Sequence, residues 1–125
     1  MAIRVVRLGT PRGPGEGLRL GTVRRPPRGV PKAEFASRDF YDLWLPEAAP
    51  SEELVKAAAS DCDWAAFRKK YRAEMGQPEK ARLLDLLVAL SRQADFSVGC
   101  YCEDEGRCHR SVLRELLMER GAEIR

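Results

Sequence analysis

The sequence predicts a small α/β protein: a three-layer fold with a partly parallel sheet flanked by helices. Apolar runs containing β-branched residues lie near both ends of the 125-residue chain, at residues 3–8 and 96–101. Amphipathic helical patterns occupy much of the chain between them, most clearly at residues 63–76. Strands at both ends with helices between them favour a layered α/β arrangement.

Length and composition indicate one domain over residues 1–125, because 44% hydrophobic and 33% charged residues suit a chain with its own core. No stretch approaches the roughly 20 apolar residues that cross a bilayer, and the N-terminus lacks an apolar signal region. We therefore expect no membrane association and a cytoplasmic location. Three of the four cysteines are crowded together, unlike a secreted disulfide framework, so reduced thiols are expected.

Two short strands are expected in the first quarter of the chain. The first is Ile3 to Leu8, and Leu18 to Val23 forms the second. Pro26 and Pro27 then keep the chain extended. The aromatic segment from Phe40 to Leu45 fits either a strand or a packed loop, and both remain open.

Four helices are expected after residue 50. Ser51 begins a short one that ends near Ala59, and Asp63 caps the next. Pro78 lies in the first turn of the third, and the last runs from about Arg107 to Arg120. Apolar spacing predicts a buried face for each of the last three helices. These faces consist of Trp64, Phe67, Tyr71 and Met75 in the second helix, Leu83, Leu86, Leu87 and Leu90 in the third, and Val112, Leu113, Leu116 and Leu117 in the last.

Residues 100–111 contain three cysteines and the only histidine of the chain. They lie at the predicted turn from a strand into a helix, where open α/β sheets place their sites. Helical spacing puts His109 on the buried face of the last helix. Strand alternation puts Cys100 and Cys102 on one face, so both are expected to converge with Cys108 and His109.

This cluster has three interpretations. Three thiolates and an imidazole match the ligands of structural zinc. However, zinc ligands usually come as two pairs joined by a long connection, whereas these all come from one short segment. We therefore predict no metal and no cofactor, with zinc or an iron–sulfur centre as the alternative. In the plainest interpretation the cysteines and His109 are core residues, Arg110 is solvated and Cys62 is structural.

The third interpretation is a reactive thiol. A helix N-terminus and a neighbouring imidazole or guanidinium stabilise a thiolate, which favours Cys108 and makes Cys100 the second candidate. Sulfurtransferases and cysteine-based phosphatases use a similar strand, loop and helix to hold an oxyanion. The phosphatase spacing would place its cysteine at position 101, which is Tyr101. The acidic residues 103–105 also oppose an oxyanion there.

A basic segment provides candidate ligand-binding residues. The first 32 residues carry many arginines against one acidic residue, Glu16. Guanidinium groups suit phosphate or carboxylate ligands, although a solvated basic loop explains the pattern as well. Nucleic-acid binding is supported less, because no aromatic residues alternate with the arginines; Trp44, Trp64 and Tyr71 are expected in the core. The basic residues are Arg19, Arg24, Arg25, Arg28, Lys32 and Arg38.

The sequence Cys-His-Arg-Ser at residues 108–111, preceded by Cys-Tyr-Cys-Glu-Asp at 100–104, resembles the "domain of unknown function 488" family. Residues 27–32 are similar to its Trp-Pro-Arg-Gly segment, 45–51 to the loop before a helix, and 64–75 to its Trp-x-x-Phe-x-x-x-Tyr-x-x-Glu helix. Cys102 stands where the family commonly has Glu, and Pro27 where it has Trp. The resemblance implies the fold and the place of the site, and it implies no reaction.

Together these observations predict a site between residues 100–110 and 24–32. Its ligand is expected to be a small anionic or nucleotide-like molecule. Cys100 and Cys108 are the candidate nucleophiles or redox thiols and His109 their partner. The expected anion-binding residues are Arg25, Arg28 and Arg110. The alternative is a non-catalytic regulatory module that binds nucleic acid or protein, with a structural Cys/His cluster.

Overall fold

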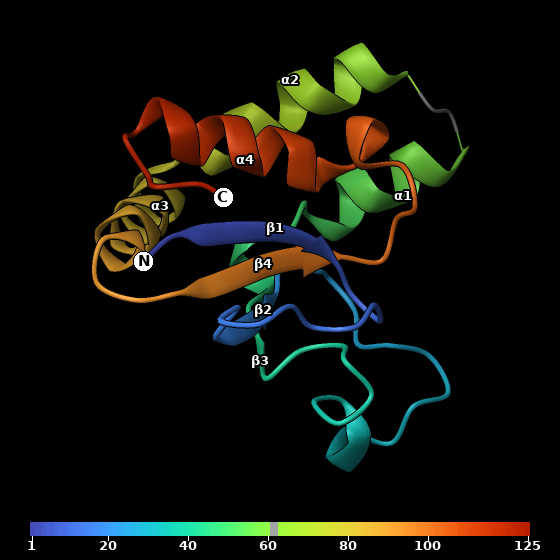
Figure 1. The fold of residues 1–125 in the computed structure, drawn as a ribbon. Coiled ribbons are helices and arrows are strands. Elements are labelled where there is room, and N and C mark those ends of the chain that lie inside the picture. The colour runs from blue at the N-terminus through green and yellow to red at the C-terminus, as the bar shows by residue number, and fades with distance from the viewer. Residues whose placement is uncertain (61–62) are drawn as a thin grey trace.

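The computed structural model describes residues 1–60 and 63–125, so the predicted structural role of Cys62 lies outside the described residues. The strands are β1 (Ile3–Arg7), β2 (Leu18–Gly21), β3 (Leu43–Trp44) and β4 (Phe96–Cys100). The α-helices are α1 (Glu52–Ser60), α2 (Trp64–Met75), α3 (Pro78–Ser91) and α4 (His109–Glu119). Short 3-10 turns are η1 (Lys32–Glu34), η2 (Pro46–Ala48) and η3 (Glu105–Arg107) (Figure 1).

The strands form one sheet in the order β1-β4-β2-β3. Every pairing is parallel, so the sheet is more uniformly parallel over the described residues than the sequence suggested. All five residues of β4, a central strand, are buried, as expected for a strand covered on both faces. Near the C-terminus Ile124 pairs with Ile3 in a parallel bridge. The predicted α/β class is confirmed.

One face of the sheet packs against the helices (Figure 1). Ile3, Phe96 and Val98 occupy neighbouring positions on that face and join residues of all four α-helices in one buried cluster. The predicted buried face of α4 is confirmed, since all four of its named residues are buried. Asp63 caps α2 by accepting a hydrogen bond from the amide of Ala66, as predicted.

Loops rather than helices cover part of the opposite face. Arg19, on β2, is completely buried there. Its guanidinium donates to both carboxylate oxygens of Glu16, at 2.8 and 3.0 Å. The Ser97 hydroxyl of β4 donates to the same carboxylate at 2.9 Å. Arg19 therefore stabilises the sheet and is not part of an exposed basic segment, which corrects the sequence-based expectation.

The segment that the sequence left open contains a short edge strand, β3. Tyr41, just before it, is buried against Gly21 of β2. A Cβ atom at position 21 would lie 2.3 Å from the Tyr41 ring, so glycine is required for this close approach. Trp44 is 46% exposed, and the prediction that it is a core residue is wrong. Its indole Nε1 donates a hydrogen bond to the carbonyl of Val23 at 2.7 Å, which links β3 to the residues that follow β2.

The predicted buried face of α3 is also wrong in part. Leu86 and Leu90 are exposed, at 54% and 41%. The residues that α3 buries are Leu84, Leu87, Val88 and Ser91. Leucines occupy more than one face of this helix, so hydrophobic spacing alone fits two stripes, and packing on the neighbouring elements selects one.

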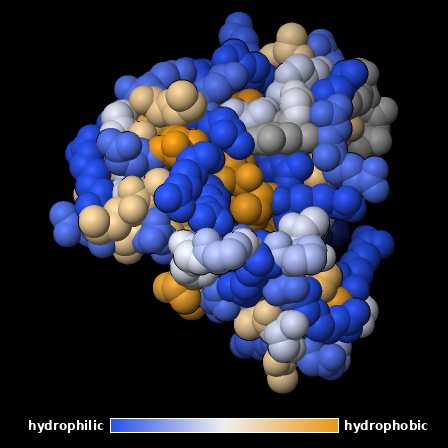
Figure 2. All heavy atoms as spheres, viewed as in Figure 1, coloured by the Kyte–Doolittle hydropathy of each residue, from blue (hydrophilic) through white to orange (hydrophobic). Residues whose placement is uncertain are grey.

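No helix among the described residues is long and apolar enough to span a bilayer. The face seen in Figure 2 is mainly hydrophilic, with hydrophobic atoms visible over β1. That strand lies at an edge of the sheet and its Val5 and Val6 are only half-buried.

Candidate functional site

The Cys/His segment lies at the carboxyl edge of the parallel sheet. Cys100 is the last residue of β4, and Cys108 is the N-cap residue of α4. The turn between them contains η3. Thr22 and Val23 follow the neighbouring strand β2 and lie beside this turn. Ligands of open α/β sheets bind outside this edge, where helix N-termini also point.

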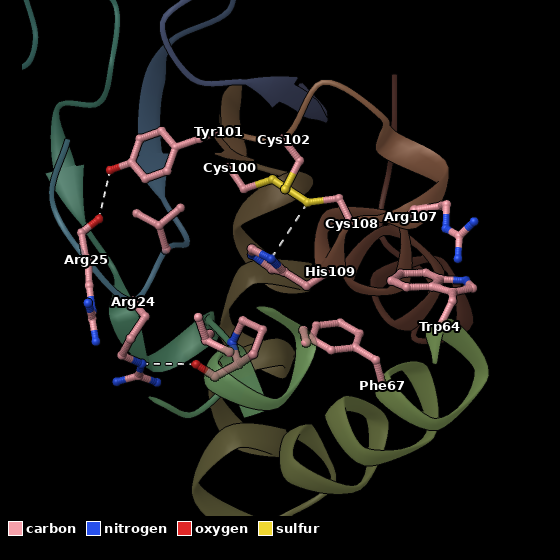
Figure 3. A pocket seen from close by; sticks show the side chains of 14 residues that line it. Arg24, Arg25, Trp64, Phe67, Cys100, Tyr101, Cys102, Arg107, Cys108 and His109 are labelled. Atoms are coloured by element: carbon pink, nitrogen blue, oxygen red, sulfur yellow. Dashed lines mark hydrogen bonds between the residues drawn. A yellow bond between two sulfur atoms is a disulfide. The ribbon is translucent and has the colours of Figure 1, made fainter. Parts of the chain in front are cut away.

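The three sulfur atoms of the segment lie together, as strand alternation predicted. Cys100 and Cys108 are buried and are joined by a disulfide (Figure 3). Cys102 is an exposed free cysteine. All three Sγ atoms lie within 4.8 Å of one another. Cys102 therefore belongs to the cluster, although its replacement of the family's glutamate gave no reason to expect a role for it.

His109 is fixed in the cluster by contacts on three sides. It is buried, as its place on the helix predicted. Its Nε2 lies 2.6 Å from the carbonyl oxygen of Thr22, which accepts a hydrogen from it. The Tyr71 ring packs edge-on against the imidazole with centroids 5.6 Å apart. Nδ1 faces the Cys108 sulfur at 3.8 Å (Figure 3).

Burial and, to a smaller extent, the nearby Arg110 charge lower the pKa of His109 from 6.5 to about 4, although the hydrogen bond to Thr22 opposes this shift. The imidazole is therefore neutral near pH 7. Because Nε2 carries the hydrogen that Thr22 accepts, Nδ1 presents a lone pair to the cysteines. A neutral imidazole in this orientation can accept a proton from Cys108 or bind a metal ion.

A cavity of about 290 Å³ opens beside the cluster. Trp64 and Phe67 of α2 are stacked on each other in its wall, with ring centroids 5.4 Å apart (Figure 3). Both were expected only as core residues, and their exposure to a cavity depends on what α2 packs against. Further apolar walls come from Val23, Pro50, Val55 and Ala58. This lining suits the flat or apolar body of a small ligand.

Three arginines line the same cavity: Arg24, Arg25 and Arg107. The Arg24 guanidinium donates hydrogen bonds to the carbonyls of Pro46, Ala49 and Pro50. The loop before α1 therefore holds this side chain in place. Arg25 is exposed and 3.9 Å from Glu52. Arg107 ends η3 and is exposed. Arg107 received no role from the sequence, although it directly precedes the Cys-His-Arg motif.

Two of the predicted anion-binding residues lie elsewhere. Arg28 is exposed and lines an adjacent cavity of about 550 Å³, which shares Arg25 and Tyr101 with the first. Arg110 is buried and is not among the residues that line either cavity. It is therefore not the solvated residue of the plainest interpretation. Of the three predicted arginines, the structure brings Arg25 to the cysteine cavity.

The acidic residues of the turn point to other partners. Glu103 is exposed and pairs with Arg7 of β1 at 3.4 Å. Asp104 accepts a hydrogen bond from the amide of Gly106. Neither lines the cysteine cavity. These two carboxylates therefore leave the arginine-lined side of the cavity available to an anion.

Fold and site together define a parallel α/β protein with a thiol-rich cavity at the carboxyl edge of its sheet. The chain belongs to the DUF488 family: residues 3–121 match the group DUF488-N3a, described as the "Active DUF488-N3 subclade". It is also similar to the uncharacterized protein YeaO of Escherichia coli (strain K12), with 37% identity over 89 residues, which cover 69% of this chain and 74% of YeaO. No solved structure matches. The predicted family is confirmed.

Proposed function

We propose that the protein is a thiol-dependent enzyme that acts on a small ligand with an anionic group and an apolar or nucleotide-like body. The single observation that carries the proposal is the position of the Cys108 sulfur. It lies in the wall of the cavity, at the N-terminus of α4 and 3.8 Å from Nδ1 of His109. A helix N-terminus and a base are the two features that activate a cysteine nucleophile.

In the reaction, an external dithiol first reduces the disulfide and is itself oxidised. The Cys108 proton then moves to His109 Nδ1 as the Cys108 sulfur forms a bond to an electrophilic centre of the ligand, so that no imidazolium has to form beforehand. The leaving group departs with the bonding electron pair and takes the proton from His109. Water attacks the covalent intermediate, gives a proton to the Cys108 sulfur and releases the product. Cys100 is the thiol with which Cys108 forms the disulfide of the structure, and both remain reduced through the catalytic cycle.

Substrate binding is assigned to the cavity's two kinds of wall. Arg25 and Arg107 bind the anionic group, since both residues line the cavity and a guanidinium carries the positive charge that carboxylates and phosphates match. Trp64 and Phe67 contact the apolar or planar body. The family group's description as active supports an enzyme. The cytoplasmic location expected from the sequence would supply the reducing conditions.

The test is site-resolved alkylation of the reduced, metal-free chain with iodoacetamide at pH 7, followed by mass spectrometry. Cys108 should react at least about tenfold faster than a free thiol of pKa about 8.5. Adenosine monophosphate and pyrophosphate are the probes, and one of them should protect Cys108. Equal, slow reaction of all the thiols would overturn the proposal.

Matched arginine variants locate the binding site. Protection should weaken in Arg25→Ala and Arg107→Ala, and it should persist in Arg38→Ala, which changes an exposed arginine outside the lining of both cavities. If protection were lost in Arg28→Ala alone, the ligand would bind in the adjacent cavity rather than in the cysteine cavity.

A second candidate is a non-catalytic module that binds nucleic acid. It is supported by Phe40 and Tyr101, which lie beside Arg25 and Arg28 in the adjacent cavity and provide the aromatic groups that the sequence did not place there. Single-stranded RNA would then bind with an affinity that falls steeply with salt, and Arg28→Ala would weaken it.

A further inference from the structure

The cysteine cluster has the composition and spacing of a site for a soft metal ion. Three Sγ atoms lie within 4.8 Å of one another, and the His109 Nδ1 atom lies 3.8 Å from that of Cys108. These four atoms come from the end of β4, the turn and the start of α4. Thiolate and imidazole are the preferred ligands of zinc.

One tetrahedral ion can enter this cluster once the Cys100–Cys108 disulfide is reduced and the two sulfurs separate. With zinc–sulfur bonds near 2.3 Å and a zinc–nitrogen bond near 2.0 Å, bound sulfurs lie about 3.8 Å apart and a bound sulfur and nitrogen about 3.6 Å apart. The Cα atoms of Cys100 and Cys108 are 7.9 Å apart, beyond the roughly 4.4–6.8 Å usual for a disulfide. When an ion lies between the two sulfurs, the Cα atoms of the two cysteines can be farther apart than a direct sulfur–sulfur bond allows.

The orientation of His109 provides an independent observation. Metal-binding histidines usually donate their second N–H to a carbonyl or carboxylate, which fixes the tautomer and aims the other nitrogen at the ion. Here Nε2 donates to the Thr22 carbonyl at 2.6 Å. The Tyr71 ring holds the imidazole plane. Nδ1 is thereby directed at the Cys108 sulfur (Figure 3).

We propose that the reduced cluster binds one zinc ion through the Sγ atoms of Cys100, Cys102 and Cys108 and the Nδ1 atom of His109. An external dithiol reduces the Cys100–Cys108 disulfide with two electrons and two protons and becomes a disulfide itself. Three thiols then release three protons as the ion binds. The resulting site has a net charge of −1, which Arg25 and Arg107 in the wall of the same cavity offset.

This inference goes beyond the proposed enzyme and does not rest on it, because an ion can bind whether or not Cys108 is a nucleophile. The two are linked in one respect: a bound ion occupies the Cys108 sulfur and blocks its alkylation. Zinc would therefore keep the cluster reduced and inactive until the ion is removed. Alkylation in the metal-free protein tests the enzyme, and metal binding tests the site, so either can fail alone.

The experiment uses the reduced full chain, freed of metal and of excess reductant. Titration with zinc against a chromophoric chelator should give one ion per chain. Titration with Co²⁺ should give the intense visible absorption of a tetrahedral site and the thiolate-to-cobalt absorption of three sulfurs. The Co²⁺ spectrum counts thiolates without any substitution, so it holds even if a variant fails to fold. Absence of stoichiometric binding, or an octahedral Co²⁺ spectrum, would overturn the proposal.

Variants then assign the ligands. Cys102→Ser and His109→Gln should each weaken zinc binding by at least the roughly 10- to 100-fold that follows loss of an outer partner. The control is Cys62→Ser, which removes the remaining cysteine of the chain and should bind zinc as wild type does. Binding lost in Cys62→Ser and retained in Cys102→Ser would place the ion elsewhere and defeat the assignment.

Discussion

His109 Nε2 donates a hydrogen bond to the carbonyl oxygen of Thr22 at 2.6 Å. This contact joins the first turn of α4 to the residue after β2 at the carboxyl edge of the sheet. One nitrogen of the ring thus has a structural role, and the other faces the Cys108 sulfur, where the proposed function gives it a chemical role. The two roles can be separated by substitution.

His109→Gln should fold nearly as well as wild type, because the glutamine amide can replace Nε2 as the donor to Thr22. His109→Ala loses that bond and the packing against Tyr71, at a cost of about 2–4 kcal/mol in the free energy of unfolding. Urea denaturation of both variants checks this. An alanine variant as stable as wild type would show that the bond contributes little.

Acid should weaken the fold through Glu16. Burial opposes its ionisation, but hydrogen bonds from Arg19, Ser97 and the amide of Gly13 outweigh burial and lower the pKa from 4.5 to about 2. A folded-state pKa below the unfolded one stabilises the protein above pH 4.5, and that stabilisation is lost as the pH falls towards 2. The loss should be on the order of 3 kcal/mol.

The measurement is the free energy of unfolding between pH 7 and pH 2. Glu16→Gln should remove this part of the pH dependence and lower stability at pH 7, because it leaves Arg19 buried without its carboxylate. Glu53→Gln, at an exposed position in α1, is the control and should keep the wild-type profile. An unchanged profile in Glu16→Gln would assign the acid sensitivity to other groups.

The two leucine faces of α3 should differ sharply in their effect on stability. Leu84 is completely buried, whereas Leu86 is 54% exposed. Leu84→Ala should cost about 2–5 kcal/mol through lost burial and a cavity. Leu86→Ala should cost less than about 0.5 kcal/mol. Thermal or urea unfolding of the pair compares them directly, and equal losses would contradict the packing of this helix.

The position of the cysteine cluster was easier to predict from the sequence than the arginines that line the cavity beside it. Density of cysteine and histidine at a strand-to-helix turn locates the cluster, and helical spacing turns His109 inward, because both depend on neighbours within a few residues. Arg110 sits in the first turn of α4 yet is buried away from the cavity. Arg28 is near Arg25 in sequence but lines the adjacent cavity. The directions of the Arg110 and Arg28 side chains depend on how the turn before α4 and the loop after β2 pack against the rest of the protein.

The α/β class, the buried face of α4 and the meeting of Cys100, Cys108 and His109 can all be predicted from the order of residues along the chain, because they depend on spacing within single strands and helices. The burial of Arg19 on Glu16 could be seen only in the folded chain, where the same carboxylate also accepts a hydrogen bond from Ser97, 81 residues away. The tertiary structure alone also placed Trp64 and Phe67 in the cavity wall. Such features depend on partners brought together by the parallel sheet, and local periodicity carries no information about them.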